Sequence, residues 1–272
     1  MAYATIASMH RLGWTAAFLY AAATVVSAAD PPDPLARARL LYNQRQFEAA
    51  VNAAEEARRT GERADAADLI AARAYLERFR ESAAAADLTN ARDRLRRINP
   101  ERFGAGERVE FIIGLAEALY LDQSAGAAAE VFESVLARPD DLGPDARERT
   151  LDWWASALDR DAGPRPDLER RAVYQKICDR MRAELGANPA SASAAYWLSA
   201  AARGQGDLQA AWDAAQAGWV RASLATDHGA ALRGDLDRLV QRAIVPERAR
   251  MLAQPPEILA LEWERFKEKW TK

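Results

Sequence analysis

Residues 204–218, GQGDLQAAWDAAQAG, place a glycine-containing turn directly before a run of small residues that favour a helix. Glycine frees a turn backbone, and an aspartate at a helix start accepts hydrogen bonds from the free N–H groups there. We therefore expect Gly206 to form the turn and Asp207 to cap the helix that follows. The small and apolar residues three and four positions apart share one face of that helix: Leu208, Ala211, Ala215 and Gly218.

Copies of this pattern occur earlier in the chain. The segments 42–57 (YNQRQFEAAVNAAEEA) and 126–139 (GAAAEVFESVLARP) also combine a turn, a large residue, and small residues three and four positions apart. Segments with matching spacing precede two of the copies, in 111–121 (FIIGLAEALYL) and 194–202 (AAYWLSAAA). A unit that recurs in this way predicts helical hairpins that stack on one another.

Composition supports a helical fold. The chain contains 63 alanines among its 272 residues, and alanine has the highest helix propensity. Hydrophobic residues make up 50% and charged residues 28%, as in an ordinary folded protein. After Pro34 no long stretch alternates polar and apolar residues as a strand would. The sequence predicts an all-α chain with hairpins at residues 34–60, 64–98, 106–138, 145–186 and 191–222.

These residues resemble the tetratricopeptide repeat. The pattern of that repeat is a large residue, a Leu, a Gly or Ala, and an aromatic residue, in that order. An Ala, a second aromatic residue, another Ala and a Pro then follow. The resemblance covers about residues 35–222 and is best in the hairpins 106–138 and 191–222. It implies an α-α superhelix, a solenoid of about five hairpins. Other families of helical-hairpin repeats stay open, because equivalent positions lie 38, 40, 49 and 34 residues apart: Ala50, Leu88, Ala128, Ile177 and Ala211.

The first 28 residues have the layout of a secretory signal peptide. A short start ending at Arg11 precedes an apolar run, residues 12–26, and small residues then form a cleavage site after Ala28 or Ala29. We therefore expect an exported bacterial protein, periplasmic or secreted. The alternative is an uncleaved N-terminal membrane anchor, although the run is shorter than the roughly 20 residues that span a bilayer.

The rest of the chain divides into repeats, 29–225, and a C-terminal segment, 226–272. Solenoids need a terminal cap, because the last repeat otherwise exposes its core. We predict that the C-terminal segment forms capping helices. The last helix carries one apolar stripe: Leu259, Trp263, Phe266 and Trp270. The alternative is a helix that docks a partner or self-associates, and in that case deleting residues 256–272 leaves a soluble monomer.

Residues that carry familiar chemistry are scarce. Only His10 and His228 are present, so a histidine-based triad or a multi-histidine metal site is nearly excluded. The single cysteine, Cys178, is expected to be a small buried hydrophobe. Phosphate-binding glycine motifs are absent, and a net charge of −3 does not favour nucleic-acid binding. We predict no metal, no cofactor and no enzymatic activity.

The resemblance implies that the first helix of each hairpin faces a concave groove that binds a segment of another protein. The groove residues that it implies are Glu110, Ile113, Glu117, Tyr120, Arg149, Asp152, Trp153, Ser156, Asp159, Ser193, Tyr196, Trp197 and Arg203. Acids outnumber bases in this set, so we expect a groove that prefers basic or neutral segments.

Together these predictions describe a non-enzymatic protein–protein interaction scaffold of the bacterial cell envelope. The expected partner is another protein or a peptide segment, and we expect no binding to nucleic acid. The scaffold itself would contact a membrane only through its N-terminal segment, if that segment is not cleaved. The alternative is a carboxylate-based enzyme, or an enzyme subunit, with its site between hairpins. Buried acids with raised pKa values in a deep pocket would favour the enzyme, whereas an open groove lined by Trp153 and Tyr196 would favour the scaffold.

Overall fold

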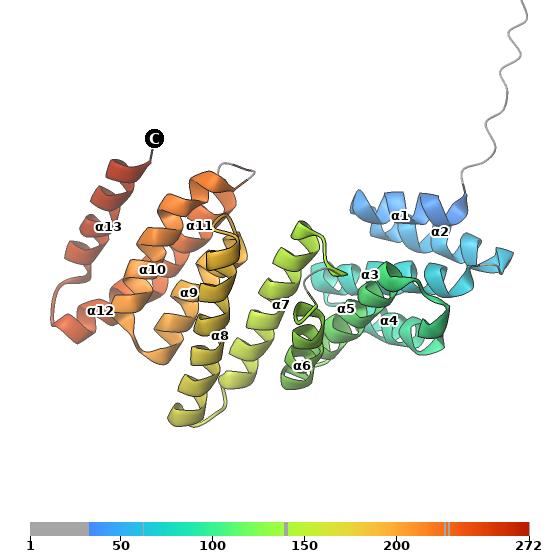
Figure 1. Cartoon of the computed structure of the whole chain (residues 1–272), viewed down its shortest axis with the longest axis horizontal. Coiled ribbons are helices and arrows are strands. Elements are labelled where there is room, and N and C mark those ends of the chain that lie inside the picture. The colour runs from blue at the N-terminus through green and yellow to red at the C-terminus, as the bar shows by residue number, and fades with distance from the viewer. Residues whose placement is uncertain (1–32, 62, 139–140, 226, 228, 272) are drawn as a thin grey trace, which may run out of the picture. The chain divides into compact units, whose positions relative to one another are not determined.

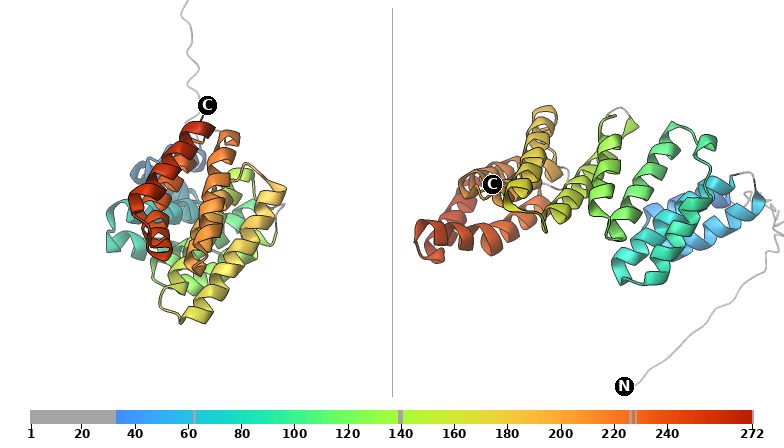
Figure 2. Two further views of the ribbon diagram at one scale, coloured as in Figure 1. Left: turned by 90° about the vertical axis from the view of Figure 1, so that its left-hand side faces the viewer. Right: turned by 90° about the horizontal axis from the view of Figure 1, so that it is seen from below.

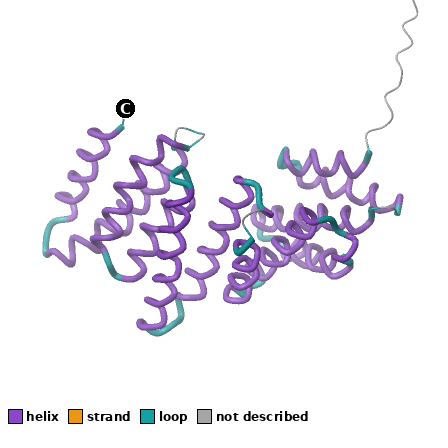
Figure 3. The backbone as a smooth tube through the Cα atoms, in the orientation of Figure 1, coloured by secondary structure: helices purple, strands orange, loops and turns teal. Residues whose placement is uncertain are grey.

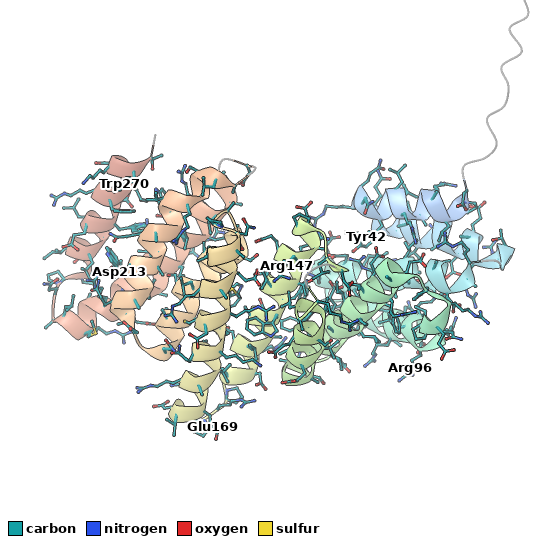
Figure 4. All side chains as sticks on the ribbon, in the orientation of Figure 1. Tyr42, Arg96, Arg147, Glu169, Asp213 and Trp270 are labelled. Carbon is teal, nitrogen blue, oxygen red and sulfur yellow. The ribbon has the colours of Figure 1, made fainter. Side chains whose placement is uncertain are left out.

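The computed structural model describes residues 33–271 except 62, 139–140, 226 and 228 (Figure 1). Throughout this part of the chain the regular elements are helices, and no strand occurs (Figure 3). The predicted all-α fold is therefore confirmed. The signal peptide predicted for residues 1–28 lies outside the described residues.

The helices follow one another with short connections. In chain order they are α1 (Pro34–Asn43), α2 (Phe47–Thr60), α3 (Ala64–Ser82), α4 (Ala85–Arg97), α5 (Ala105–Leu121), α6 (Ala125–Leu136), α7 (Pro144–Ala162), α8 (Asp167–Ala187), α9 (Ala192–Gln205), α10 (Leu208–Arg221), α11 (Ala230–Leu239), α12 (Val245–Leu252) and α13 (Pro256–Trp270). The π-helical turn Val240–Ile244 joins α11 to α12. Within the described part of the chain, no helix is long and apolar enough to cross a membrane.

Helices that are neighbours in sequence pack against each other from α1 to α10, and this order can be followed in the right-hand view of Figure 2. A second set of contacts joins every other helix, so that α1, α3, α5, α7 and α9 touch in that order. Contacts between consecutive helices and between alternate ones are compatible with a solenoid of helical repeats. They also bring side chains of the odd-numbered helices onto one shared surface.

The turn at residues 204–218 forms as the sequence predicts. Gly206 ends α9 with φ of 86°, a left-handed conformation that side chains with a Cβ atom disfavour. The Asp207 carboxylate then accepts a hydrogen bond from the Ala210 backbone N–H at 2.9 Å, which caps α10. These two residues together reverse the chain between paired helices.

Small residues hold α9 and α10 close together. Ala211 and Ala215 of α10 are fully buried, and the Ser199 hydroxyl of α9 donates to the Ala211 carbonyl at 2.8 Å. A Cβ atom added at Gly218 would lie 3.6 Å from the Ala195 Cβ atom and only 3.0 Å from Leu236. Larger side chains at these positions would push the two helices apart.

The hydrophobic core runs along the row of helices. One set of buried residues spans α5 to α13 and includes Trp154 and Phe132, while another joins α1 to α5 around Leu69 and Leu76. Cys178 on α8 is fully buried, as predicted for a small hydrophobe. In the described part of the chain the core is therefore distributed along the row, and each helix packs mainly on the helices next to it.

The last helix, α13, packs on α10 and α12. Trp263 is fully buried, with its ring 5.8 Å from that of Trp212 and 5.5 Å from that of Trp219. Its indole N–H donates to the Asp237 carboxylate at 2.9 Å. The predicted apolar stripe thus packs inward at Leu259 and Trp263, and it becomes exposed at its end, where Trp270 is 48% accessible.

We expect Trp263→Ala to lower the free energy of unfolding by about 3–5 kcal/mol, because it leaves a cavity among the α10 tryptophans. Trp270→Ala, the matched control on the same helix, should change it by less than about 1 kcal/mol. Deleting residues 256–272 should uncover Trp212 and Trp219 and give an unstable, aggregating chain. Urea unfolding and size-exclusion chromatography measure these outcomes. A stable monomeric deletion variant would contradict the capping role and favour self-association through α13.

Candidate functional site

The odd-numbered helices line a cavity of about 370 Å³, called here the central cavity. Its walls come from α1 with the following turn, from the first residue of α2, and from α3, α5 and α7: Tyr42, Asn43, Arg45, Phe47, Arg73, Glu77, Arg80, Glu117, Arg149 and Trp153. Two further cavities, of about 190 Å³ and about 440 Å³, share lining residues with it. Together they form a surface that follows the contacts α1–α3, α3–α5 and α5–α7.

The structure brings many of the predicted groove residues to this surface. Those that line one or more of the three cavities are Glu110, Ile113, Glu117, Tyr120, Arg149, Asp152, Trp153 and Ser156. Their common feature is a position on α5 or α7. The role of these residues in partner binding stays a prediction.

Trp153 occupies the point where the three cavities meet. Its ring stacks on Phe132 of α6, with centroids 6.1 Å apart, and meets the edge of Tyr120 at 5.0 Å. The Arg80 guanidinium lies 4.9 Å from the centre of the Trp153 ring, a cation–π contact between α3 and α7. These contacts fix the indole while leaving part of it accessible from the cavities.

Arg73 of α3 lies deeper in the same surface. Its guanidinium is 4.9 Å from the centre of the Tyr42 ring, and one terminal nitrogen is 3.5 Å from the Glu110 carboxylate. Its Nε atom is buried and has no hydrogen-bond partner among the described residues. Burial also raises the pKa of Tyr42 to about 12, so that this phenol stays neutral beside the cation.

Glu117 of α5 is buried between the central cavity and its 190 Å³ neighbour. Burial raises the pKa of its carboxyl, because the charged form loses hydration. The guanidinium groups of Arg73, Arg80 and Arg149 act in the opposite direction, and Glu77 acts with burial. The result is a carboxyl whose ionisation is disfavoured by its surroundings.

Arg149 of α7 is exposed to both of these cavities. In the described part of the chain, no other side chain lies within hydrogen-bond or ion-pair distance of its guanidinium group. Arg80, by contrast, donates to the Glu77 carboxylate at 2.8 Å. Arg149 is therefore the cation of this surface whose donors are most available to a ligand.

The charge of the central cavity differs from the sequence-based expectation. Four arginines and two glutamates line it, whereas the predicted groove residues contained more acids than bases. The predicted set began at the third hairpin and did not include Arg45, Arg73 and Arg80. Across the three cavities together the lining residues still include five acids and four arginines, so the excess of arginine belongs to the central cavity alone. No pattern in α3 marks Arg73 and Arg80 as groove residues, because their place at this surface depends on the packing of α3 against α5.

The remaining predicted groove residues lie in contacts farther along the chain. Trp197 is buried, and its indole N–H donates to Asp152 at 2.8 Å, with the Tyr196 ring 5.5 Å away. Asp159 accepts a hydrogen bond from the Tyr174 hydroxyl at 2.8 Å.

Ser193 is bound by Glu148, which accepts from both its backbone N–H and its hydroxyl at 3.0 Å. Arg203 pairs with Glu247 of α12 at 3.1 Å and lines a separate cavity of about 340 Å³. These contacts tie α7, α8, α9 and α12 together.

Glu117→Gln should stabilise the chain at neutral pH. The raised pKa means that the folded chain binds the Glu117 proton more tightly than the unfolded chain, so stability falls as pH rises above the ordinary value of 4.5. Glutamine keeps the shape and removes the charge. The gain in unfolding free energy should therefore be larger near pH 7 than near pH 4, measured by urea unfolding.

The matched control is Glu110→Gln, which removes an exposed carboxylate on the same helix. It should give no gain at either pH. A Glu117→Gln variant less stable than the wild type at neutral pH would show instead that ionised Glu117 is needed to balance Arg73 and Arg149.

Comparisons of the chain with known protein families, curated proteins and solved structures give no match. In the described residues, no group of three or more His, Cys, Asp or Glu side chains is placed to hold a metal ion.

Proposed function

We propose that this chain is a non-enzymatic scaffold that binds a segment of a partner protein along the odd-numbered helices. One observation carries this proposal: α1, α3, α5 and α7 jointly line three adjoining cavities that meet at Trp153. A surface built from four successive odd-numbered helices suits an extended or helical segment better than a small molecule held in one deep pocket.

The fold we infer for this scaffold is a tetratricopeptide-like superhelix. Its support is the turn at Gly206 and Asp207, the small residues where α9 crosses α10, and the contacts between alternate helices. In such a superhelix the first helices of the hairpins face the concave side. That arrangement makes the cavities between α3, α5 and α7 the binding groove.

The side chains at this surface suit protein recognition. Tryptophan, tyrosine and arginine contribute most often to the binding energy of protein interfaces. Trp153 and Tyr120 supply rigid aromatic area that is already held by its neighbours, and Arg149 supplies free hydrogen-bond donors. The two aromatic rings would need little ordering on binding, which favours affinity.

Location in the bacterial cell envelope is part of the proposal and depends on the signal peptide predicted for residues 1–28. Export would place the groove in the periplasm or outside the cell. If the segment stayed uncleaved, the same groove would be tethered to a membrane.

A second candidate, carboxylate chemistry between hairpins, is favoured by one observation. Burial raises the pKa of Glu117, and Glu77 lies in the same cavity. Hydrolysis by paired carboxylates needs one acid to stay protonated and the other to act freely across a cleft. Here the Glu77 carboxylate is bound by Arg80, and arginines surround Glu117, so anion binding is the better use of this cavity.

The proposal can be tested by photo-crosslinking in the full chain. A photoreactive amino acid at Ser156, which lines the 440 Å³ cavity, should give discrete crosslinked partners in envelope extracts. The same group at Arg97, exposed at the end of α4 and outside these cavities, is the matched control and should give none. Excess unlabelled chain should suppress the crosslinks at Ser156. Equal crosslinking at both positions would contradict binding along the groove.

A further inference from the structure

The central cavity carries an excess of positive charge. Its four arginines face two glutamates, and one of those glutamates, Glu117, is buried where ionisation is disfavoured. Charges of one sign lining a cavity raise the local concentration of ligands of the opposite sign. The chain as a whole is acidic, with a net charge of −3, so this positive region is a local feature.

Two of the four arginines are already committed to partners on α3. Arg80 donates to Glu77 at 2.8 Å, and Arg45 lies 3.7 Å from Glu81. The Arg80 pair is hydrogen-bonded, whereas the Arg45 pair is an exposed ion pair at the rim of the cavity, where water can solvate both groups.

The other two arginines have donors to spare. Arg149 has no hydrogen-bond or ion-pair partner among the described residues, and the buried Nε atom of Arg73 is likewise unpartnered. A guanidinium group has five N–H donors, and a buried donor without an acceptor costs free energy. A ligand carboxylate could use the free fork of Arg149 and lie beside the positive charge of Arg73, which lines the same cavity.

We infer that the partner segment is acidic, and that an Asp or Glu side chain of it enters the central cavity to pair with Arg149 and Arg73. This inference rests on the proposed function and names the chemistry of its partner. A carboxylate matches the two parallel N–H groups of a guanidinium and forms charge-assisted hydrogen bonds with both. Apolar atoms next to the carboxylate would pack on the accessible part of Trp153.

The geometry favours an acidic peptide over a polyanion such as nucleic acid. Glu110 and Glu77 stand beside the arginines, and a continuous phosphate backbone would meet these carboxylates as well as the cations. Side chains of a peptide can instead place one carboxylate at the cations and uncharged groups elsewhere. The acidic groups beside the arginines thus select for spaced, single negative charges.

The test is selection of random decapeptides displayed on phage against the immobilised full chain. The wild type should enrich peptides that contain Asp or Glu together with apolar residues. Arg149→Glu reverses one exposed charge in the cavity and should abolish that enrichment. Arg97→Glu, the same reversal on α4 outside these cavities, is the matched control and should keep it. Unchanged thermal unfolding of both variants shows that they fold.

An enriched peptide is then synthesised together with a version in which each Asp and Glu is replaced by Asn and Gln. Fluorescence anisotropy should show about 10-fold weaker binding of the neutral version to the wild type, and a similar loss for the acidic peptide on Arg149→Ala. Enrichment of basic peptides, or acidic enrichment that survives Arg149→Glu, would overturn the inference. If basic peptides bind the wild type and bind Ser156→Trp more weakly, the acidic partner is wrong but binding along the groove still holds. If no peptide is enriched, the result counts against the acidic partner and against binding along the groove.

Discussion

The close approach of paired helices at small side chains is the constraint on which the rest of this structure depends. At Ala211, Ala215 and Ser199 the α9 and α10 backbones come close enough for a hydroxyl to reach a carbonyl across the pair. Short turns such as the one at Gly206 keep the pairs antiparallel. Because each pair is narrow, the odd-numbered helices can touch one another along the row, and their side chains can share one surface.

That shared surface carries the binding site that we propose. No single helix supplies the central cavity, since Arg73 comes from α3, Glu117 from α5 and Arg149 from α7. The packing that brings them together also buries Glu117 and leaves Arg149 free. The charge distribution from which we infer an acidic partner is thus a consequence of helix spacing, and the contacts of Trp153 join α7 to α3, α5 and α6.

Much of the fold could be predicted from the sequence because it depends on local patterns. Residues close together in the sequence determine each of three features: the turn at Gly206 and Asp207, the small face of α10 and the apolar stripe of α13. The charge of the site could not be predicted in the same way. Arg73 and Arg80 follow no repeat signature, and Trp197 turns inward to Asp152 although its neighbour in sequence, Tyr196, is more exposed. Which side chains meet across helices depends on packing between hairpins, and one helix does not encode that packing.

The most direct test of this account is the thermal unfolding of Ala211→Leu. Leucine at this buried crossing should force α9 and α10 apart and lower the free energy of unfolding by about 1–3 kcal/mol, a fall in Tm of roughly 2–4 °C for each kcal/mol. Ala183→Leu, at an exposed position of α8, is the matched control and should leave Tm nearly unchanged. If Ala211→Leu unfolds at the same temperature as Ala183→Leu, small side chains do not set the helix spacing, and the account is contradicted.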